Sequence, residues 1–428
     1  MTRLIVKPST LNGQISIPTS KSHTMRAILF AAMGKGKSLI AHYLASPDTN
    51  AMIHACRLIG ATINQSPGQL EVIGVNGRIS YNSGVIHAGN SGIILRFLSA
   101  LGGLSLNPVV ITGDESIRNQ RPMHSLLNGL RQLGVSAISM RGNDFAPVII
   151  QGPIQYDYAR INGEDSQFVS ALLIASAFAG HPIEIEVENP GEKPWVEMTL
   201  DWFNRLGIFC THQNFQNYRL QGESSYQGFA YQVPGDFSSA AFPIAAALIT
   251  RSELTLKNLN MDDSQGDKKL ISVFKKMGAL IDYRESDQSL QIKKSGSLIG
   301  IDVDVNDLID ALPILAVVAC FAEGKTILRN AGAARYKECD RIHVMCKELS
   351  KMGARIIETR DGLIISHSTL HGQNLFSHHD HRVAMALAVG GLGASGVTGI
   401  ESVDCLTKTY STFIRDFNIL GAEFKLTV

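Results

Sequence analysis

An α/β fold with two domains, each containing three repeats, is predicted by three features of the sequence. Amphipathic segments end six times in an apolar residue, a glycine and a further apolar residue, and these glycines stand 68 to 75 residues apart. A second series of helical segments, out of phase with the first, is rich in Ala, Leu and Ile on every face. Strand-like runs alternate with both series, and a unit of about 70 residues is too long for the common solenoids. The repeated glycines are Gly60, Gly134, Gly207, Gly278, Gly353 and Gly421.

Each repeat is expected to contain two helices of different kinds. The repeated glycine is the residue that normally follows the last turn of a helix, because it adopts a left-handed backbone at no steric cost. The helices that are apolar on all faces should be buried. We expect their polar N-termini to face one cleft between the domains. These helices are predicted to begin near Ser22, Ser91, Ser166, Ser238, Asp307 and His381.

The chain is expected to cross between the two domains twice. Two strand-to-helix junctions contain Pro or Gly, one at residues 17–19 and the other at residues 232–235. If the chain crosses at both, residues 19–234 form the first domain. Residues 1–18 and 235–428 then form the second.

Composition narrows the class of protein. The 428 residues are 45% hydrophobic and 18% charged, with a net charge of +1, so no global basic field points to nucleic acid. The longest apolar stretch, residues 311–322, is too short to span a bilayer and contains Pro313. Six cysteines without a CxxC pair favour reduced thiols. No signal-like apolar segment opens the chain. We therefore expect a cytoplasmic monomer that binds neither membrane nor nucleic acid.

The most informative segment follows Pro18, where Ser20, Lys21, Ser22 and Arg26 lie at the expected start of a buried helix. A helix N-terminus already attracts anions, and added cations strengthen that preference. The alternative is an ordinary exposed basic helix start. Gathered in one cleft, the cations of several such segments would bind a small ligand with several negative charges. These cations are Lys21, Arg26, Arg121, Lys337, Arg341, Arg382 and Lys408.

Glu338 is a candidate acid/base group because it stands between Lys337 and Arg341. Its cationic neighbours should lower its pKa, whereas closure of a cleft and anionic ligands should raise it. The alternative is a solvated helix face. The run 378–381 (His-His-Asp-His) resembles a metal cluster, but adjacent residues point to different sides, so we expect no metal there.

Short motifs of the chain match one known family in order, at residues 18–22, 89–92 with Arg96, 121–123, 166–167, 234–236, 337–341, 380–382 and 408–409. Together they resemble the 5-enolpyruvylshikimate-3-phosphate (EPSP) synthase family. The resemblance implies two domains of three βαβαββ-like units each, which close over the substrates. It also implies transfer of the enolpyruvyl group of phosphoenolpyruvate to the 5-hydroxyl of shikimate 3-phosphate, in chorismate and aromatic amino-acid biosynthesis, without a metal or organic cofactor.

The resemblance also implies roles for individual residues. Asp310, with Lys21, would take the proton of the 5-hydroxyl, and Glu338 would protonate the methylene carbon and later remove a proton. The residues expected to hold shikimate 3-phosphate are Lys21, Ser22, Arg26, Ser166, Gln167, Asp310 and Lys337. Those expected to hold phosphoenolpyruvate are Lys21, Gly92, Arg121, Gln167, Arg341, Arg382 and Lys408.

The chain departs from the family pattern at Asp165 and Glu192, where hydroxyl groups are usual, and at Ile93, where Thr is usual. We expect both carboxylates to turn away from the substrate phosphate and pair with Lys193 or another cation. The alternatives are that the carboxylates are protonated in the closed state, or that the true acceptor lacks that phosphate. Ile93 should weaken binding of glyphosate, the inhibitor that resembles phosphoenolpyruvate.

Two other functions compete with this interpretation. A UDP-N-acetylglucosamine enolpyruvyl transferase usually has a reactive Cys before its Arg-Pro pair, but residues 113–120 contain none. A non-catalytic binder of anions or nucleic acid could use the same repeat, although the neutral net charge argues against it.

Overall fold

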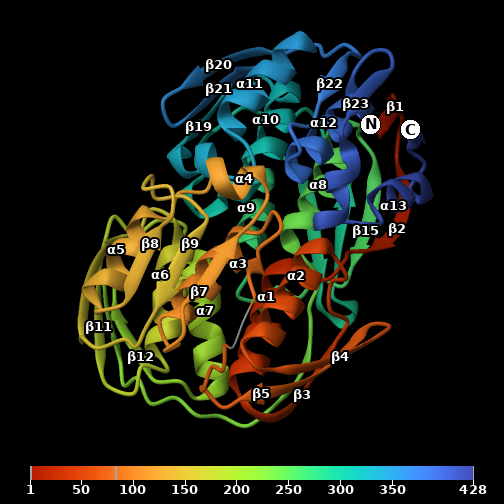
Figure 1. Ribbon diagram of the computed structural model, residues 1–428. Helices are drawn as coiled ribbons and strands as arrows, with labels where there is room; N and C mark the ends of the chain where they lie inside the picture. Colours follow the sequence, from red (N-terminus) through yellow and green to blue (C-terminus); the bar gives the residue numbers. More distant parts are fainter. Residues whose placement is uncertain (1, 82–83, 428) are drawn as a thin grey trace. The chain divides into compact units, whose positions relative to one another are not determined.

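The computed structural model describes residues 2–81 and 84–427 (Figure 1). The chain forms two compact units. We call Lys21–Val233 the first unit, and Met1–Ser20 with Pro234–Val428 the second unit. The limits of these units lie within two residues of the predicted crossing points.

The strands of the first unit form three four-stranded sheets with one common strand order. In each sheet the first two strands are parallel and the remaining pairings are antiparallel. The sheets are β14(Ala230–Gln232)-β3(Lys35–Ala41)-β5(Gln69–Val75)-β4(Thr62–Ser66), β6(Ile86–His87)-β7(Val109–Thr112)-β9(Val148–Gln151)-β8(Ser136–Ser139) and β10(Tyr158–Asn162)-β11(Ile183–Glu188)-β13(Asn217–Leu220)-β12(Cys210–Gln213).

The second unit repeats the same design three times, which confirms the predicted α/β repeat. Again each sheet has one parallel and two antiparallel pairings. Its sheets are β2(Asn12–Ser16)-β15(Glu253–Lys257)-β17(Ser289–Lys293)-β16(Leu280–Arg284), β18(Asp302–Asp304)-β19(Lys325–Arg329)-β21(Gly362–Ser366)-β20(Arg355–Thr359) and β22(Asn374–Phe376)-β23(Thr398–Glu401)-β1(Arg3–Lys7)-β24(Glu423–Thr427).

Three of the six repeats are not continuous segments of the chain, and two connections between the units account for two of them. Strand β2 pairs within the second unit, but the next element, α1, belongs to the first unit. Strand β14 pairs within the first unit, but the next element, α8, belongs to the second. The last sheet takes β1 and β24 from opposite ends of the chain, so the two termini lie side by side (Figure 1). The N-terminal strand therefore completes the last repeat.

One series of helices is buried, as predicted. These helices contribute to two separate hydrophobic cores, one in each unit. In the first unit they are α1(Lys21–Met33), α3(Gly92–Gly102) and α6(Ser166–Ser176), and in the second α8(Phe237–Ile249), α10(Leu312–Phe321) and α12(His381–Gly393).

The expected start of one buried helix, near Asp307, is wrong. A 3₁₀ segment, η3(Asn306–Ala311), comes first, and Leu308 within it has a non-helical φ of −133°. The α-helix begins at Leu312 and has Pro313 in its first turn. Proline lacks an N–H, so it fits the first turn but interrupts the hydrogen bonds of a helix that begins earlier.

The second series of helices is amphipathic and ends as predicted. All six repeated glycines have a positive φ, from 69° at Gly207 to 108° at Gly60. Among the described residues, no helix combines the length and the apolar character needed to cross a membrane. The amphipathic helices are α2(Pro47–Leu58), α5(His124–Gln132), α7(Lys193–Leu206), α9(Lys269–Lys276), α11(Arg341–Lys351) and α13(Phe413–Ile419). The short helices are α4(Glu115–Asn119), η1(Gly266–Lys268), η2(Glu285–Asp287), η4(Gly332–Tyr336) and η5(Val403–Lys408).

Candidate functional site

The predicted site residues lie at the N-terminal ends of the buried helices and in the loops beside them. Four of these helices are capped by the side chain of the preceding residue, which satisfies backbone N–H groups at the positive end of the helix dipole. The capping residues are Ser91, Asp165, Asp236 and Asp380. Three of the four are carboxylates, so any bound anion shares these helix ends with fixed negative charge.

At the start of α1, Lys21 and Arg26 have different surroundings. Lys21 Nζ lies 3.8 Å from Asp48 Oδ2, and its side chain keeps some exposure. Arg26 is buried, and it donates from Nε to Thr199 Oγ1 at 3.0 Å and from Nη2 to the Trp195 carbonyl at 3.0 Å. Burial lowers the pKa of Arg26 to about 9. The guanidinium therefore joins α1 to α7, whereas the Lys21 side chain remains partly exposed.

The start of α3 brings Gly92 close to two arginines. A Cβ at Gly92 would lie 2.7 Å from Arg96 Nη1, 3.0 Å from Gln167 Oε1 and 3.6 Å from Arg121 Nη1. Arg96 Nη1 donates to Gln167 Oε1 at 2.9 Å, and Arg96 Nη2 lies 3.2 Å from Asp165 Oδ2. Gly92, Arg121 and Gln167, predicted to act on the same substrate, are thus brought together.

The start of α6 differs from the expected arrangement. Glu192 Oε2 accepts hydrogen bonds from Ser166 N at 3.2 Å and from Ser166 Oγ at 2.7 Å. The expectation that Glu192 turns away from the phosphate site at Ser166 is therefore wrong, because two donors at a helix N-terminus hold its carboxylate. Asp165 does pair with another cation, Arg96, and its Oδ1 caps Gln167 N at 2.9 Å.

In the second unit, Arg341 is almost fully buried and is surrounded by carboxylates. It donates from Nε to Asp380 Oδ2 at 2.8 Å, from Nη1 to Asp310 Oδ1 at 2.7 Å and from Nη2 to Glu338 Oε2 at 2.9 Å. Burial acts to lower the pKa of Arg341, but these three carboxylates raise it well above its usual value. The alternative of a solvated helix face is wrong, since Lys337 is buried as well.

Each of the two predicted acid/base residues lies between two cations. Asp310 reaches Arg341, and its Oδ2 lies 2.9 Å from Arg382 Nη2. Glu338 reaches Arg341, and its Oε1 accepts from Lys408 Nζ at 2.7 Å. Burial favours the neutral form of Asp310, but Arg382, Arg341 and Lys337 outweigh it and hold the pKa of Asp310 well below its usual range. Of the predicted cations, Lys337, Arg341, Arg382 and Lys408 lie around these carboxylates in the second unit, and the last three are already paired with them.

Asp267 lies close to this cluster and was not predicted. Ser238 Oγ donates to Asp267 Oδ2, and the charges of Arg382, Asp310 and Asp236 act on Asp267. Burial raises the pKa of Asp267 to about 7, and the cation Arg382 only partly opposes this effect. Its sequence surroundings, Gln265-Gly266-Asp267, resemble an ordinary turn and gave no signal.

The sequence predicts Arg96 only as part of a family motif, although the apolar segment around it already indicates a buried cation. It is the one charged residue of α3, a helix that is otherwise apolar or small. Arg26 in α1 and Arg382 in α12 also lie in the first half of a buried helix. A buried cation needs partners, so a lone arginine in such a helix predicts a local cluster of polar groups.

No metal cluster was found among the described residues. Within the run 378–381, His378 Nε2 bonds Glu348 Oε1 at 3.0 Å, whereas His381 is buried.

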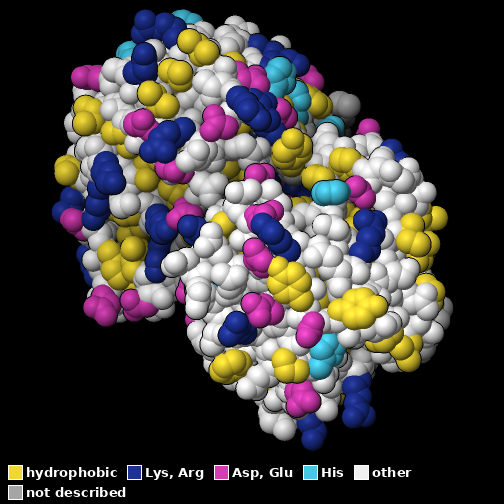
Figure 2. Space-filling view, turned by 90° about the vertical axis from the view of Figure 1, so that its left-hand side faces the viewer, with side chains coloured by type: hydrophobic (Ala, Val, Ile, Leu, Met, Phe, Trp, Pro, Cys, Tyr) yellow, Lys and Arg dark blue, Asp and Glu magenta, His cyan; other side chains and the backbone are white. Residues whose placement is uncertain are grey.

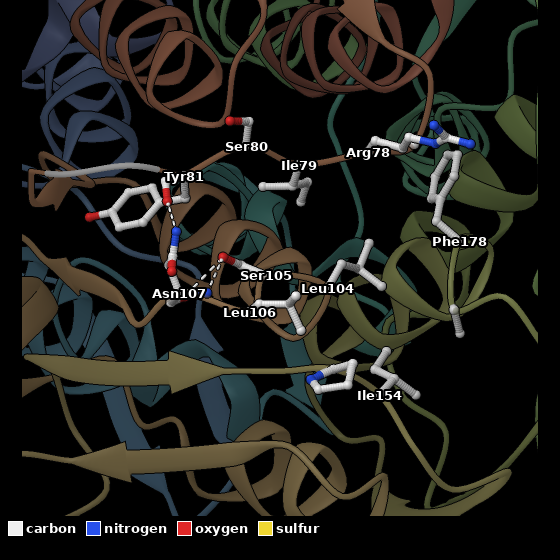
Figure 3. A pocket seen from close by; sticks show the side chains of 13 residues that line it. Arg78, Ile79, Ser80, Tyr81, Leu104, Ser105, Leu106, Asn107, Ile154 and Phe178 are labelled. Atoms are coloured by element: carbon white, nitrogen blue, oxygen red, sulfur yellow. Dashed lines mark hydrogen bonds between the residues drawn. The ribbon is translucent and has the colours of Figure 1, made fainter.

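A hollow of about 420 Å³ in the first unit lies away from the candidate site (Figure 3). Its lining includes Leu104 and Phe178, which follow the C-terminal ends of α3 and α6, so it opens at the helix ends opposite to the candidate site.

Comparisons with known proteins agree with the predicted family. A family model described as "EPSP synthase (3-phosphoshikimate 1-carboxyvinyltransferase)" matches residues 5–417. The 3-phosphoshikimate 1-carboxyvinyltransferase of Chlamydia muridarum is 44% identical over 425 residues, covering 98% of this chain and 95% of that protein. The enzyme of the same name from Chlamydia pneumoniae is 42% identical over 422 residues, covering 98% and 94%. A solved EPSP synthase structure from Acinetobacter baumannii is 28% identical, with a TM-score of 0.83 and complete coverage of both chains.

Proposed function

The chain belongs to the EPSP synthase (3-phosphoshikimate 1-carboxyvinyltransferase) family, and we propose that the residues described above carry out its reaction. The reaction transfers the enolpyruvyl group of phosphoenolpyruvate to the 5-hydroxyl of shikimate 3-phosphate and releases phosphate. The observation that best supports the assignment is the position of Asp310 and Glu338, each held between two cations. Two acid/base groups with cations beside both suit a reaction that moves protons on anionic substrates.

The two units, in this proposal, are the two domains of the enzyme, and both contribute to substrate binding. Arg26 acts on shikimate 3-phosphate by fixing the start of α7, because its donors already bond Thr199 and Trp195. Shikimate 3-phosphate is bound directly by Lys21, Ser22, Ser166, Gln167, Asp310 and Lys337, and Arg26 supports this binding through α7. Phosphoenolpyruvate is bound by Lys21, Gly92, Arg121, Gln167, Arg341, Arg382 and Lys408.

The ion pairs of the second unit suggest how Asp310 becomes a base. Its pKa is low because Arg382, Arg341 and Lys337 oppose the effect of burial. When the phosphate and carboxylate of phosphoenolpyruvate pair with Arg341 and Arg382, these cations stabilise Asp310 less. Burial then raises its pKa, so the substrate itself prepares Asp310 to accept the proton of the 5-hydroxyl.

Addition and elimination follow. The 5-oxygen attacks C2 of phosphoenolpyruvate while Glu338 gives a proton to the methylene carbon, which becomes a methyl group. Fixed cations stabilise the resulting tetrahedral intermediate. A proton then leaves the methyl group towards Glu338, and the bond between C2 and the phosphate oxygen breaks. The departing phosphate takes up the proton that the 5-hydroxyl gave to Asp310, so hydrogen phosphate is released with the new enol ether.

The competing functions are less well supported. The family description and the names of the relatives do not favour a UDP-N-acetylglucosamine transferase. Figure 2 shows basic and acidic side chains interspersed on one face rather than a continuous basic surface, which is a poor match to a nucleic-acid binder. We also propose that the protein is a monomer and lies in the cytoplasm.

A phosphate-release assay tests this function. With both shikimate 3-phosphate and phosphoenolpyruvate we expect continuous release of inorganic phosphate, and with either substrate alone we expect none. Replacement of shikimate 3-phosphate by UDP-N-acetylglucosamine should abolish release. Release with the sugar nucleotide, or none with the shikimate pair, would refute the proposal.

A further inference from the structure

The hydrogen-bond donors at the start of α6 already hold an anion that belongs to the protein. The carboxylate of Glu192 accepts from both the backbone N–H and the hydroxyl of Ser166 through one oxygen, Oε2. Glu192 is only 2% exposed, so this contact is shielded from water. A phosphate oxygen bound to Ser166 would use the same two donors, at the N-terminus of an 11-residue helix.

The backbone around Glu192 is held in place by neighbouring strand ends. Gly191 N donates to the Gly163 carbonyl at 3.0 Å, and a Cβ at Gly191 would lie 2.7 Å from the Glu164 carbonyl oxygen. Glu192 O accepts from Trp195 N at 3.0 Å, where α7 begins. The segment cannot withdraw as a whole without breaking these contacts, so release of Ser166 requires rotation of the Glu192 side chain.

The backbone of Glu192 indicates that this position is specialised. Its φ of 47° and ψ of 39° lie in the left-handed region, which a residue with a Cβ adopts at a cost. The same conformation sets the direction in which the side chain leaves the backbone, and that direction leads to Ser166.

We propose that Glu192 is a specificity-determining residue that competes with the substrate phosphate for Ser166. This inference rests on the proposed function and deepens it. In the empty protein the carboxylate satisfies the donors of Ser166. A phosphate that approaches must displace the carboxylate and then tolerate its negative charge nearby, because the backbone keeps Glu192 beside Ser166. Glu192 therefore weakens binding of the phosphorylated substrate and leaves binding of an unphosphorylated one largely unaffected.

Two substitutions separate the effect of the negative charge of Glu192 from the effect of its hydrogen bonds with Ser166. Glu192→Gln keeps an oxygen acceptor for Ser166 but removes the negative charge. Glu192→Ser removes the competing group and leaves the donors of Ser166 available. The matched control is Glu164→Gln, because Glu164 is exposed and lies two residues before Ser166.

Calorimetric titration with shikimate 3-phosphate and with shikimate measures the effect without turnover. We expect Glu192→Ser to lower the Kd for shikimate 3-phosphate about tenfold or more, as removal of a like charge near a partly desolvated site predicts. Glu192→Gln should lower it by a smaller factor. The Kd for shikimate should stay within about twofold in both variants, and Glu164→Gln should match the wild type for both ligands.

The proposal is overturned if both Glu192 variants melt as the wild type does and yet bind shikimate 3-phosphate no more tightly. An equal decrease in the Kd for shikimate would overturn it as well, since the effect would then be independent of the phosphate. Failure of the proposed function has a different signature, because wild-type protein would then release no phosphate from phosphoenolpyruvate with shikimate 3-phosphate.

Discussion

Lys408 Nζ lies 2.7 Å from Glu338 Oε1, although 70 residues separate the two in the chain. Both side chains are only 8% exposed. The other oxygen of Glu338 accepts from Arg341, so two cations stabilise its ionised form before any ligand arrives. In the proposed mechanism, Glu338 holds a proton for transfer only after an anion draws Lys408 and Arg341 away. Anion binding and proton transfer are therefore linked through the same three side chains.

Glu338→Gln should reduce turnover by about 10²-fold or more while leaving both Michaelis constants nearly unchanged, because the amide keeps the shape of the carboxylate but cannot transfer the proton. Steady-state phosphate release at saturating substrates measures this. Glu323→Gln, at an exposed position of the same unit, is the control and should be fully active. Turnover of Glu338→Gln within a few-fold of wild type would remove Glu338 from the mechanism.

Lys21→Met should raise the Michaelis constants of both substrates, each by about tenfold or more, since a charge-assisted hydrogen bond is lost to each. Lys21 remains partly exposed beside Asp48, so its ammonium group can reach a ligand. The exposed Lys35→Met serves as the control. A change confined to one Michaelis constant would contradict the bridging role of Lys21.

Gly92→Ala should raise the Michaelis constant of phosphoenolpyruvate by about tenfold. The added methyl group would lie 2.7 Å from Arg96 Nη1 and so displace the Arg96–Gln167 hydrogen bond beside Arg121. Gly296→Ala is the matched control, because a Cβ there meets nothing within 4 Å. Unchanged kinetics in Gly92→Ala would show that the space beside Gly92 is not used by the substrate.

Ile93→Thr should lower the inhibition constant of glyphosate. Ile93 is buried in the first turn of α3, directly after Gly92, and it is β-branched without a hydrogen-bond donor. Threonine has the same branching with a hydroxyl group in place of the bulkier chain. Inhibition titrated against phosphoenolpyruvate measures the effect, with Ile93→Val as the control. A threonine variant no more sensitive than wild type would contradict the prediction.

The sequence was sufficient for the parts of the fold that depend on local patterns. Gly60 and the five glycines equivalent to it each follow a helix because glycine readily adopts a positive φ. A glycine that recurs at a regular interval in the sequence was therefore enough to predict a repeated structural unit. The start of α10 was misplaced because the polar residue Asp307 resembles a helix cap, whereas Pro313 determines where the α-helix begins.

The site was harder to predict, because pairing between distant side chains leaves little local signal. Lys337 and Arg341 were recognised as cations, but nothing near them in the sequence shows that Arg341 would bond Asp310 and Asp380. The contact from Glu192 to Ser166 depends on a left-handed backbone at a residue that rarely adopts one. Asp267 gave no signal, since its surroundings are assembled from separate segments.

Asp267 leads to a prediction about stability and pH. Burial raises its pKa from the usual 3.8 to about 7 in the folded protein. Between about pH 4 and pH 7 the folded protein therefore keeps a proton that the unfolded chain has lost. Unfolding then releases a proton, so a rise in pH through this window favours the unfolded state and reduces stability.

Asp267→Asn has no proton to lose and should remove this part of the pH dependence. We expect the melting temperature of wild type to fall more between pH 5 and pH 8 than that of Asp267→Asn. The melting temperature of the variant relative to that of wild type should therefore increase as pH rises. Thermal unfolding of both proteins across this range is the measurement. Asp262→Asn, at an exposed position, should follow the wild-type curve. Parallel curves for wild type and Asp267→Asn would show that Asp267 is already ionised in the folded protein at pH 5, as it would be if Arg382 rather than burial determined its pKa.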